Sequence, residues 1–205
     1  MKYLVDKVIE TITKAGLVEV EVSARHVHLT QADVEILFGK GNILHEKRPL
    51  SQKGQYLCEE RVNLIGPKGK RERVAVLGPV RKETQAELSA GDTKELGVNA
   101  PLRESGKLNG AGALVMEGPC GKLTCASAAI IAHNHIHVTP KVAEKLQLTD
   151  DQRVNVQLIT SRPIIFQDVI IRINENFRFR MHIDLDEANA AAVSGFTLGK
   201  IIRKD

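Results

Sequence analysis

Two segments of the sequence repeat one pattern, and this repeat constrains the fold more than any other feature. HVHLTQADVEILFG begins at His26 and HIHVTPKVAEKLQL begins at His135, and each contains a His-x-His pair, a Thr and an amphipathic stretch. Thr30 and Thr139 are suited to cap a helix, and Pro140 fits the first helical turn. The repeat therefore predicts two copies of a strand that runs into a capped helix.

Alternating apolar and polar residues predict β-strands along much of the remaining chain. The period of two is visible in LVEVEV, RVNVQL and FRFRMHIDL. A second echo, GPKGK at 66–70 and GPCGK at 118–122, is typical of hairpin turns. We expect a mainly β protein of two related β-barrel domains with short capping helices, although Gly-Pro turns are common enough for this echo to be a coincidence.

The first sixteen residues predict an N-terminal amphipathic helix. Apolar residues recur there at helical spacing, at Leu4, Val5, Val8, Ile9 and Ile12. Acidic residues interrupt the apolar run, so we expect neither a signal peptide nor a membrane span.

Charge and residue types narrow the classes of partner. A net charge of +4 suits anionic ligands such as phosphate or coenzyme A. Aromatic residues make up 3% with no Trp, which argues against nucleic acid as a partner because single-strand binders stack bases on aromatic rings. Three cysteines without a CxxC pair or a leader predict a cytoplasmic protein, and packing is the favoured role for Cys120 and Cys125.

The two His-x-His pairs are candidate metal ligands. Residues two apart in a strand point to the same face with Cα atoms roughly 6.6 Å apart, so both imidazoles of His26 and His28, or of His135 and His137, can reach one ion. A single such pair is more often a polar strand edge, but two copies before capped helices favour metal binding. His182, on the polar face of FRFRMHIDL, is a fifth candidate.

The segment LGPVRKETQAELS contains two more candidates. Arg81 could present its planar guanidinium to a phosphate, and Glu87 could supply an oxygen ligand to zinc. By residue type alone, both are usually surface charges. Two alternatives stay open: a binuclear zinc hydrolase of a phosphoester or thioester, because paired zinc ions suit that chemistry equally well, and a non-enzymatic β-barrel binding module whose histidines are structural.

Six segments together resemble the signature segments of PduL-type phosphate acyltransferases. In order they are VSARHVHLT, GPKG, LGPVRKETQAELS, PLRESG, IIAHNHIHVTP and MHIDLDEANAA, and the match as a whole extends from about Val18 to Ala191. The resemblance implies an enzyme that exchanges a propionyl or acetyl group between coenzyme A and phosphate. It also implies two zinc ions at the junction of two barrels, the first formed by 17–24 and 133–205 and the second by 25–132.

The resemblance further implies roles for single residues. One zinc ion is expected at His26, His28 and Glu87, and the other at His135, His137 and His182. The expected catalytic residues are Arg81, which would bind phosphate, and Ser105. Contacts to coenzyme A are expected from Ser23, Arg48, Leu77 and Asn189. The implied reaction is direct attack of zinc-held phosphate on the thioester, without an acyl-enzyme.

Departures from the family pattern affect charge. Asn134 and Ala75 stand where the family has Arg, usually at the first position and often at the second, and Arg48 stands where Lys is common. Two fewer cations could weaken coenzyme A binding or change substrate preference. The resemblance is also compatible with a homodimer and with an N-terminal helix that packages the enzyme into a bacterial microcompartment shell. Because only Gly16 separates this helix from the first strand, we favour a helix docked on its own barrel.

Overall fold

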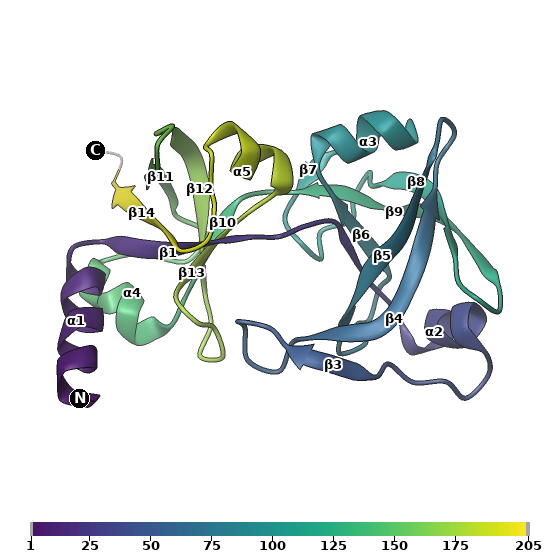
Figure 1. The fold of residues 1–205 in the computed structure, drawn as a ribbon, viewed down its shortest axis with the longest axis horizontal. Coiled ribbons are helices and arrows are strands. Elements are labelled where there is room, and N and C mark those ends of the chain that lie inside the picture. Colours follow the sequence, from purple (N-terminus) through teal and green to yellow (C-terminus); the bar gives the residue numbers. More distant parts are fainter. Residues whose placement is uncertain (1, 204–205) are drawn as a thin grey trace. The chain divides into compact units, whose positions relative to one another are not determined.

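The computed structural model describes residues 2–203, without the side chains of residues 2 and 4–6 (Figure 1). The chain divides into two compact units, one of Met1–Ser23 with Asn134–Asp205 and one of Ala24–His133. Each unit contains a β-barrel with its own apolar core. The expectation of a mainly β protein with two barrels and short helices is confirmed.

In the unit Ala24–His133, six strands close a ring in the order β4-β5-β2-β6-β9-β8. They are β2 (His26–His28), β4 (Tyr56–Ile65), β5 (Lys70–Gly78), β6 (Gln85–Leu88), β8 (Gly112–Glu117) and β9 (Lys122–Ala132). Two strands extend this sheet, β3 (Glu46–Pro49) and β7 (Leu102–Arg103). The helices of the unit are α2 (Gln31–Phe38) and α3 (Ala90–Leu96).

The other unit closes through the strand order β1-β13-β10-β12-β11-β14. Its strands are β1 (Leu17–Val22), β10 (His135–Val138), β11 (Arg153–Ile159), β12 (Ile165–Ile173), β13 (Arg180–Ile183) and β14 (Thr197–Ile202). Its helices are α1 (Lys2–Lys14), α4 (Pro140–Leu146) and α5 (Leu185–Ala190).

Both barrels use one pattern of strand pairing. The His-x-His strand β2 pairs with β5 in parallel and with β6 in antiparallel orientation, and β10 pairs in the same two ways with β12 and β13. The remaining partners correspond as well, with β9 in one barrel matching β1 in the other. Since β9 is the last strand of its unit and β1 is the first, the same ring begins at different places along the chain.

The two GPxGK segments form hairpin turns, as predicted, but they do not mark two different barrels. One joins β4 to β5 and the other joins β8 to β9, so both lie in the unit Ala24–His133. Each turn packs against a helix end, because Lys68 N–H donates to the carbonyl of Leu96 at 2.9 Å and Cys120 N–H to that of Leu37 at 3.0 Å. The echo therefore relates two halves of one barrel.

The helix caps agree only in part with the sequence pattern. The Thr30 hydroxyl accepts a hydrogen bond from the N–H of Asp33 at 3.1 Å, as a cap should. Thr139 occupies the cap position of α4 without a side-chain bond, and Pro140 begins that helix. The strand predicted across FRFRMHIDL is shorter than the alternating pattern: β13 begins only at Arg180, and it ends at Ile183 because Asp184 caps α5.

Helix α1 contacts β1 and α4 of its own unit (Figure 1). The side chains of Leu4 and Val5 lie outside the described residues, and Val8 and Ile9 are 48% and 57% exposed. The predicted apolar face is therefore largely uncovered where it is described. Within residues 2–203, the structure contains no helix with the length and apolar character needed to cross a membrane.

We predict that Gly118→Ala destabilises the protein, because the turn has no room for a methyl group. An added Cβ would lie 2.3 Å from the carbonyl oxygen of Leu37. Overpacking of this kind costs about 1–3 kcal/mol of unfolding free energy, which urea denaturation would measure. Pro119→Ala, at an exposed neighbour in the same turn, is the control and should cost about 1 kcal/mol at most. Equal stability of the two variants would contradict the tight contact.

Candidate metal centres

The first candidate metal centre lies in the unit Ala24–His133 on the paired strands β2 and β6. The short strand β2 carries His26 and His28, and the antiparallel register places Glu87 of β6 opposite His26. All three residues are buried, and one ligand atom from each lies within 4.8 Å of the others. The structure thus brings together three residues that the sequence analysis grouped.

The geometry of this cluster fits one zinc-sized ion. Nε2 of His26 lies 3.5 Å from Oε2 of Glu87, and Nε2 of His28 lies 3.8 Å from Oε1. Ligand atoms bound tetrahedrally to zinc stand roughly 3.3 Å apart. Nδ1 of His26 donates to the carbonyl of Ala24 at 2.8 Å, which leaves Nε2 for the cluster. Two imidazoles and one carboxylate are also a donor set that catalytic zinc accepts.

Burial and neighbouring charges shift the pKa values of these three side chains. Burial alone would raise the pKa of Glu87, but His26, His28 and Ser105 hold it well below its usual range. Burial lowers the pKa of His28 well below its usual value, and positive charge on His26 and Arg81 adds to this effect. Burial also lowers the pKa of His26, but the Glu87 carboxylate raises it by more. Glu87 is therefore held ionised and His28 neutral, as metal ligands must be, whereas the raised pKa of His26 favours a proton that a bound metal would displace.

A chain of hydrogen bonds joins the predicted catalytic residues Arg81 and Ser105 to Glu87, the third candidate ligand. Arg81 donates from Nη1 to Oγ of Ser105 at 3.0 Å, and Ser105 donates to Oε1 of Glu87 at 2.7 Å. The backbone N–H of Arg81 also donates to the carbonyl of Leu29 at 2.8 Å, which holds this residue beside the end of β2. A guanidinium is therefore fixed close to the carboxylate of the cluster.

The sequence analysis missed Gln85, which supports the same carboxylate. Its Nε2 donates to Oε1 of Glu87 at 2.6 Å and also lies 2.8 Å from Oγ of Ser105. Its Oε1 accepts the N–H of Gly106 at 2.9 Å. Gln85 thus connects the turn that carries Ser105 to the ligand. The signal in the sequence was its position two residues before Glu87, on the same face of the strand.

The second candidate metal centre lies in the other unit, on β10 and β13. His135 and His137 come from β10, and the register places His182 of β13 opposite His135. The ligand atoms of these residues lie within 4.8 Å of one another. The ring centroids of His135 and His182 are 5.2 Å apart, and those of His137 and His182 are 4.8 Å apart. Three converging imidazoles match a donor set of zinc enzymes.

Phe177 covers part of the second cluster. Its ring stacks on His137 with centroids 3.9 Å apart and an angle of 25° between the planes. The alternating pattern had placed Phe177 on the apolar face of a strand, but the residue lies before β13 begins. The stacked Phe177 ring restricts rotation of the His137 imidazole.

The two centres differ in one ligand at one structural position. Glu87 and His182 each lie opposite the first His of a His-x-His strand, across an antiparallel pair. The same backbone position therefore carries a carboxylate in one barrel and an imidazole in the other. A divalent ion would keep more positive charge in the second barrel, because His182 adds none of the negative charge that Glu87 supplies.

The residues expected to contact coenzyme A lie in separate parts of the chain. Arg48, on β3, and Leu77, on β5, belong to the unit Ala24–His133. Ser23, whose N–H donates to the carbonyl of Ile183 at 2.8 Å, and Asn189 of α5 belong to the other unit. Neither unit contains the whole predicted set.

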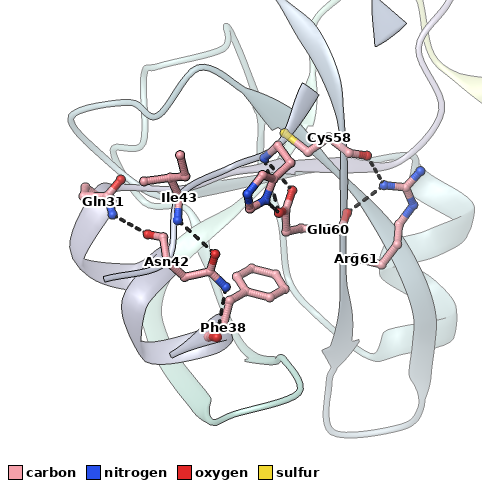
Figure 2. A network of polar contacts seen from close by, with 8 residues as sticks. Gln31, Phe38, Asn42, Ile43, Cys58, Glu60 and Arg61 are labelled. Carbon is pink, nitrogen blue, oxygen red and sulfur yellow. Dashed lines mark hydrogen bonds and ion pairs between the residues drawn. The ribbon is translucent and has the colours of Figure 1, made fainter. Parts of the chain in front are cut away.

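A network of polar contacts fixes the loop between α2 and β3 (Figure 2). Asn42 accepts at its carbonyl from Gln31, donates to the carbonyl of Phe38 and accepts the N–H of Ile43. Farther along the loop, the backbone N–H of His45 donates to Glu60 of β4, whose Oε1 lies 2.7 Å from Nδ1 of His45. His45 thus has a structural contact, and the loop is anchored at both ends.

Two of the three cysteines, Cys58 and Cys125, are poorly suited to carry an acyl group. Cys58, Cys120 and Cys125 are free thiols. Burial raises the pKa of Cys58 to about 12 and that of Cys125 to about 11. Since the thiolate is the nucleophile, these two thiols are inert near neutral pH.

We predict that Gln85→Ala weakens zinc binding by about 10-fold to 100-fold, because the ligand carboxylate loses a hydrogen bond that orients it. Competition with a chromogenic chelator would measure the affinity. Gln31→Ala is the control, since Gln31 bonds only to the carbonyl of Asn42 among the contacts described, and it should leave the affinity unchanged. An affinity unaffected by Gln85→Ala would show that Gln85 does not orient Glu87.

Comparison with known proteins gives a consistent picture. The family profile described as phosphate propanoyltransferase matches residues 19–194. A phosphate propanoyltransferase of Clostridioides difficile is 45% identical over 98% of this chain and 96% of its own length. Those of Listeria monocytogenes and Thermotoga maritima are 43% and 46% identical, over 98% and 93% of this chain and 96% and 91% of their own lengths. The chain belongs to the phosphate propanoyltransferase family.

Proposed function

We propose that this protein is a zinc-dependent phosphotransacylase that interconverts acyl-CoA plus phosphate with acyl phosphate plus coenzyme A. The observation that carries this function is the hydrogen-bonded chain from Arg81 through Ser105 to Glu87, beside two buried imidazoles. It places an anion-binding guanidinium next to a donor set for a divalent cation. Membership of the phosphate propanoyltransferase family supports the same reaction.

We infer that zinc is held by His26, His28 and Glu87 in one unit and by His135, His137 and His182 in the other. Both donor sets suit zinc in ligand type and in spacing. When bound, the metal would supply a Lewis acid that holds phosphate oxygen and offsets negative charge developing on oxygen. In the cluster of His135, His137 and His182, Phe177 would keep the His137 ring in place by stacking.

The residues of the chain would position the reactants for direct transfer. A phosphate oxygen attacks the thioester carbonyl, the carbon–sulfur bond breaks, and coenzyme A leaves as the thiolate. The planar fork of Arg81 orients the phosphate by paired charge-assisted hydrogen bonds. Ser105 holds Arg81 through its hydroxyl and, because it also donates to Glu87, keeps the guanidinium aligned with the cluster. No acyl-enzyme is needed, in accord with the high pKa of the buried thiols.

We propose coenzyme A contacts at Ser23, Arg48, Leu77 and Asn189. The exposed cation of Arg48, on β3, suits a phosphate of the cofactor. Leu77 offers apolar surface on β5. Homodimer formation and packaging into a microcompartment through α1 stay predictions from the family resemblance.

The decisive experiment measures acyl-CoA formed from coenzyme A and propionyl or acetyl phosphate by the purified protein. We expect activity before chelation, none after chelation, and recovery when zinc is restored. Folded, zinc-loaded protein that forms no acyl-CoA would overturn the proposed reaction. Release of free acid without a need for phosphate would instead indicate a hydrolase, and a protein purified without stoichiometric metal would indicate a binding module.

We predict that Arg81→Ala reduces turnover by at least about 100-fold, because the phosphate loses its orienting cation. Zinc content should stay near the wild-type value, since Arg81 is not a ligand, and elemental analysis would check it. Lys82→Ala removes the exposed cation next to it and is the control, which should retain turnover. An Arg81→Ala protein as active as the control would contradict the assignment.

A further inference from the structure

Each candidate centre is followed by the same helix-capping arrangement. Helix α3 begins at the cap Ser89, two residues after Glu87, and α5 begins at the cap Asp184, two residues after His182. In both helices the third helical residue is acidic and closes a capping box with the backbone of the cap. The position of the third ligand is thus coupled to a helix start.

The acidic residue of each capping box has a second partner directly before the His-x-His strand. Oδ1 of Asp92 accepts from Nε of Arg25 at 2.7 Å, while Oδ2 closes the box at 3.3 Å. Oε1 of Glu187 accepts from Nδ2 of Asn134 at 2.6 Å, while Oε2 accepts from the N–H of Asp184 at 2.9 Å. One carboxylate in each barrel therefore bridges the same two elements.

These bridges join the segments that carry the ligands. Arg25 and Asn134 are followed at once by the first His of each pair, and each carboxylate lies on the helix that begins two residues after the third ligand. Each bridge therefore limits how far the third ligand can move from the His-x-His strand. Contacts that orient metal-ligating side chains without touching the metal commonly control metal affinity in this way.

The two bridges differ in charge. Arg25 gives Asp92, which is 2% exposed, a charge-assisted bond, and Nε of Arg71 lies 3.6 Å from the same oxygen. Asn134 gives Glu187 a bond from a neutral amide. Burial, and to a smaller extent the negative charges of Asp184 and Asp186, raise the pKa of Glu187 to about 7. The hydrogen bonds from the backbone of Asp184 and from Asn134 lower the pKa and so oppose this shift. Charge-assisted hydrogen bonds are about twice as strong as neutral ones.

We propose that Arg25–Asp92 and Asn134–Glu187 are positioning pairs that orient the third ligand of each metal centre, and that the neutral Asn134 leaves the His182 centre the more weakly held. This inference rests on the metal centres of the proposed function. It assigns Arg25, Asp92, Asn134 and Glu187 a role in tuning metal affinity without contact to the metal.

The test uses cobalt(II), whose visible absorption spectrum reports ligand geometry, and full-length variants that retain one centre. His26→Ala with His28→Ala leaves the His182 centre, and His135→Ala with His137→Ala leaves the Glu87 centre. We expect weaker cobalt binding at the His182 centre. In that background, Asn134→Ala and Glu187→Ala should each weaken binding about tenfold, and the double variant no further, because the two residues act as one pair.

Rescue separates positioning from a general effect on folding. Asn134→Arg with Glu187→Asp copies the pair of the other barrel, and should tighten cobalt binding above the level of Asn134→Ala and restore a sharp cobalt spectrum. Asn176→Ala, at an exposed amide of the same unit, is the control and should change neither reading.

The outcomes are distinct for the inference and for the centres themselves. Cobalt affinity and spectrum unchanged by Asn134→Ala and Glu187→Ala would overturn the positioning role, as would a lower melting temperature of the metal-free protein with unchanged affinity. No cobalt binding in either background, with both proteins folded, would overturn the metal centres and the inference together. If the cobalt readings follow expectation but the protein has no phosphotransacylase activity, only the proposed reaction would be overturned.

Discussion

The antiparallel register of each His-x-His strand with its neighbour is the constraint on which both candidate metal centres depend. In the register observed, His26 faces Glu87 and His135 faces His182. A shift of one residue would turn the third ligand to the opposite face of its strand. Backbone pairing therefore creates the donor sets, and the Gln85 and Ser105 contacts only refine the direction of the carboxylate.

The residues that form the clusters were accessible from the sequence, for a physical reason. Residues at positions i and i+2 of a strand lie on the same face, so spacing alone grouped His26 with His28 and His135 with His137. The third members, Glu87 and His182, were candidates from the sequence alone, but their assignment to one cluster each needed the family resemblance, because which strands pair is a long-range property. Strand alternation likewise predicted β1 and β11, since one face of each is buried.

The parts that the sequence did not reveal depend on three-dimensional neighbours. The GPxGK echo was read as a sign of two barrels, yet both turns fit against helix ends of one barrel, a contact invisible in local sequence. The alternating pattern extends past both ends of β13, and at its C-terminal end the capping box of Asp184 outweighs the strand pattern. Gln85 was missed because its partner Gly106 comes from a distant turn. Local propensity predicts elements, whereas their ends and polar partners follow from packing.

The place of β1 in its ring has a consequence for how the chain acquires its structure during synthesis. β1 pairs with β13 and β14, which are translated last, whereas every strand of the barrel between them is complete by Ala132. The inserted barrel therefore has all its partners while the first strand still has none. During synthesis, the barrel of the unit Ala24–His133 can therefore close first. The barrel that contains β1 closes only after β13 and β14 have been made.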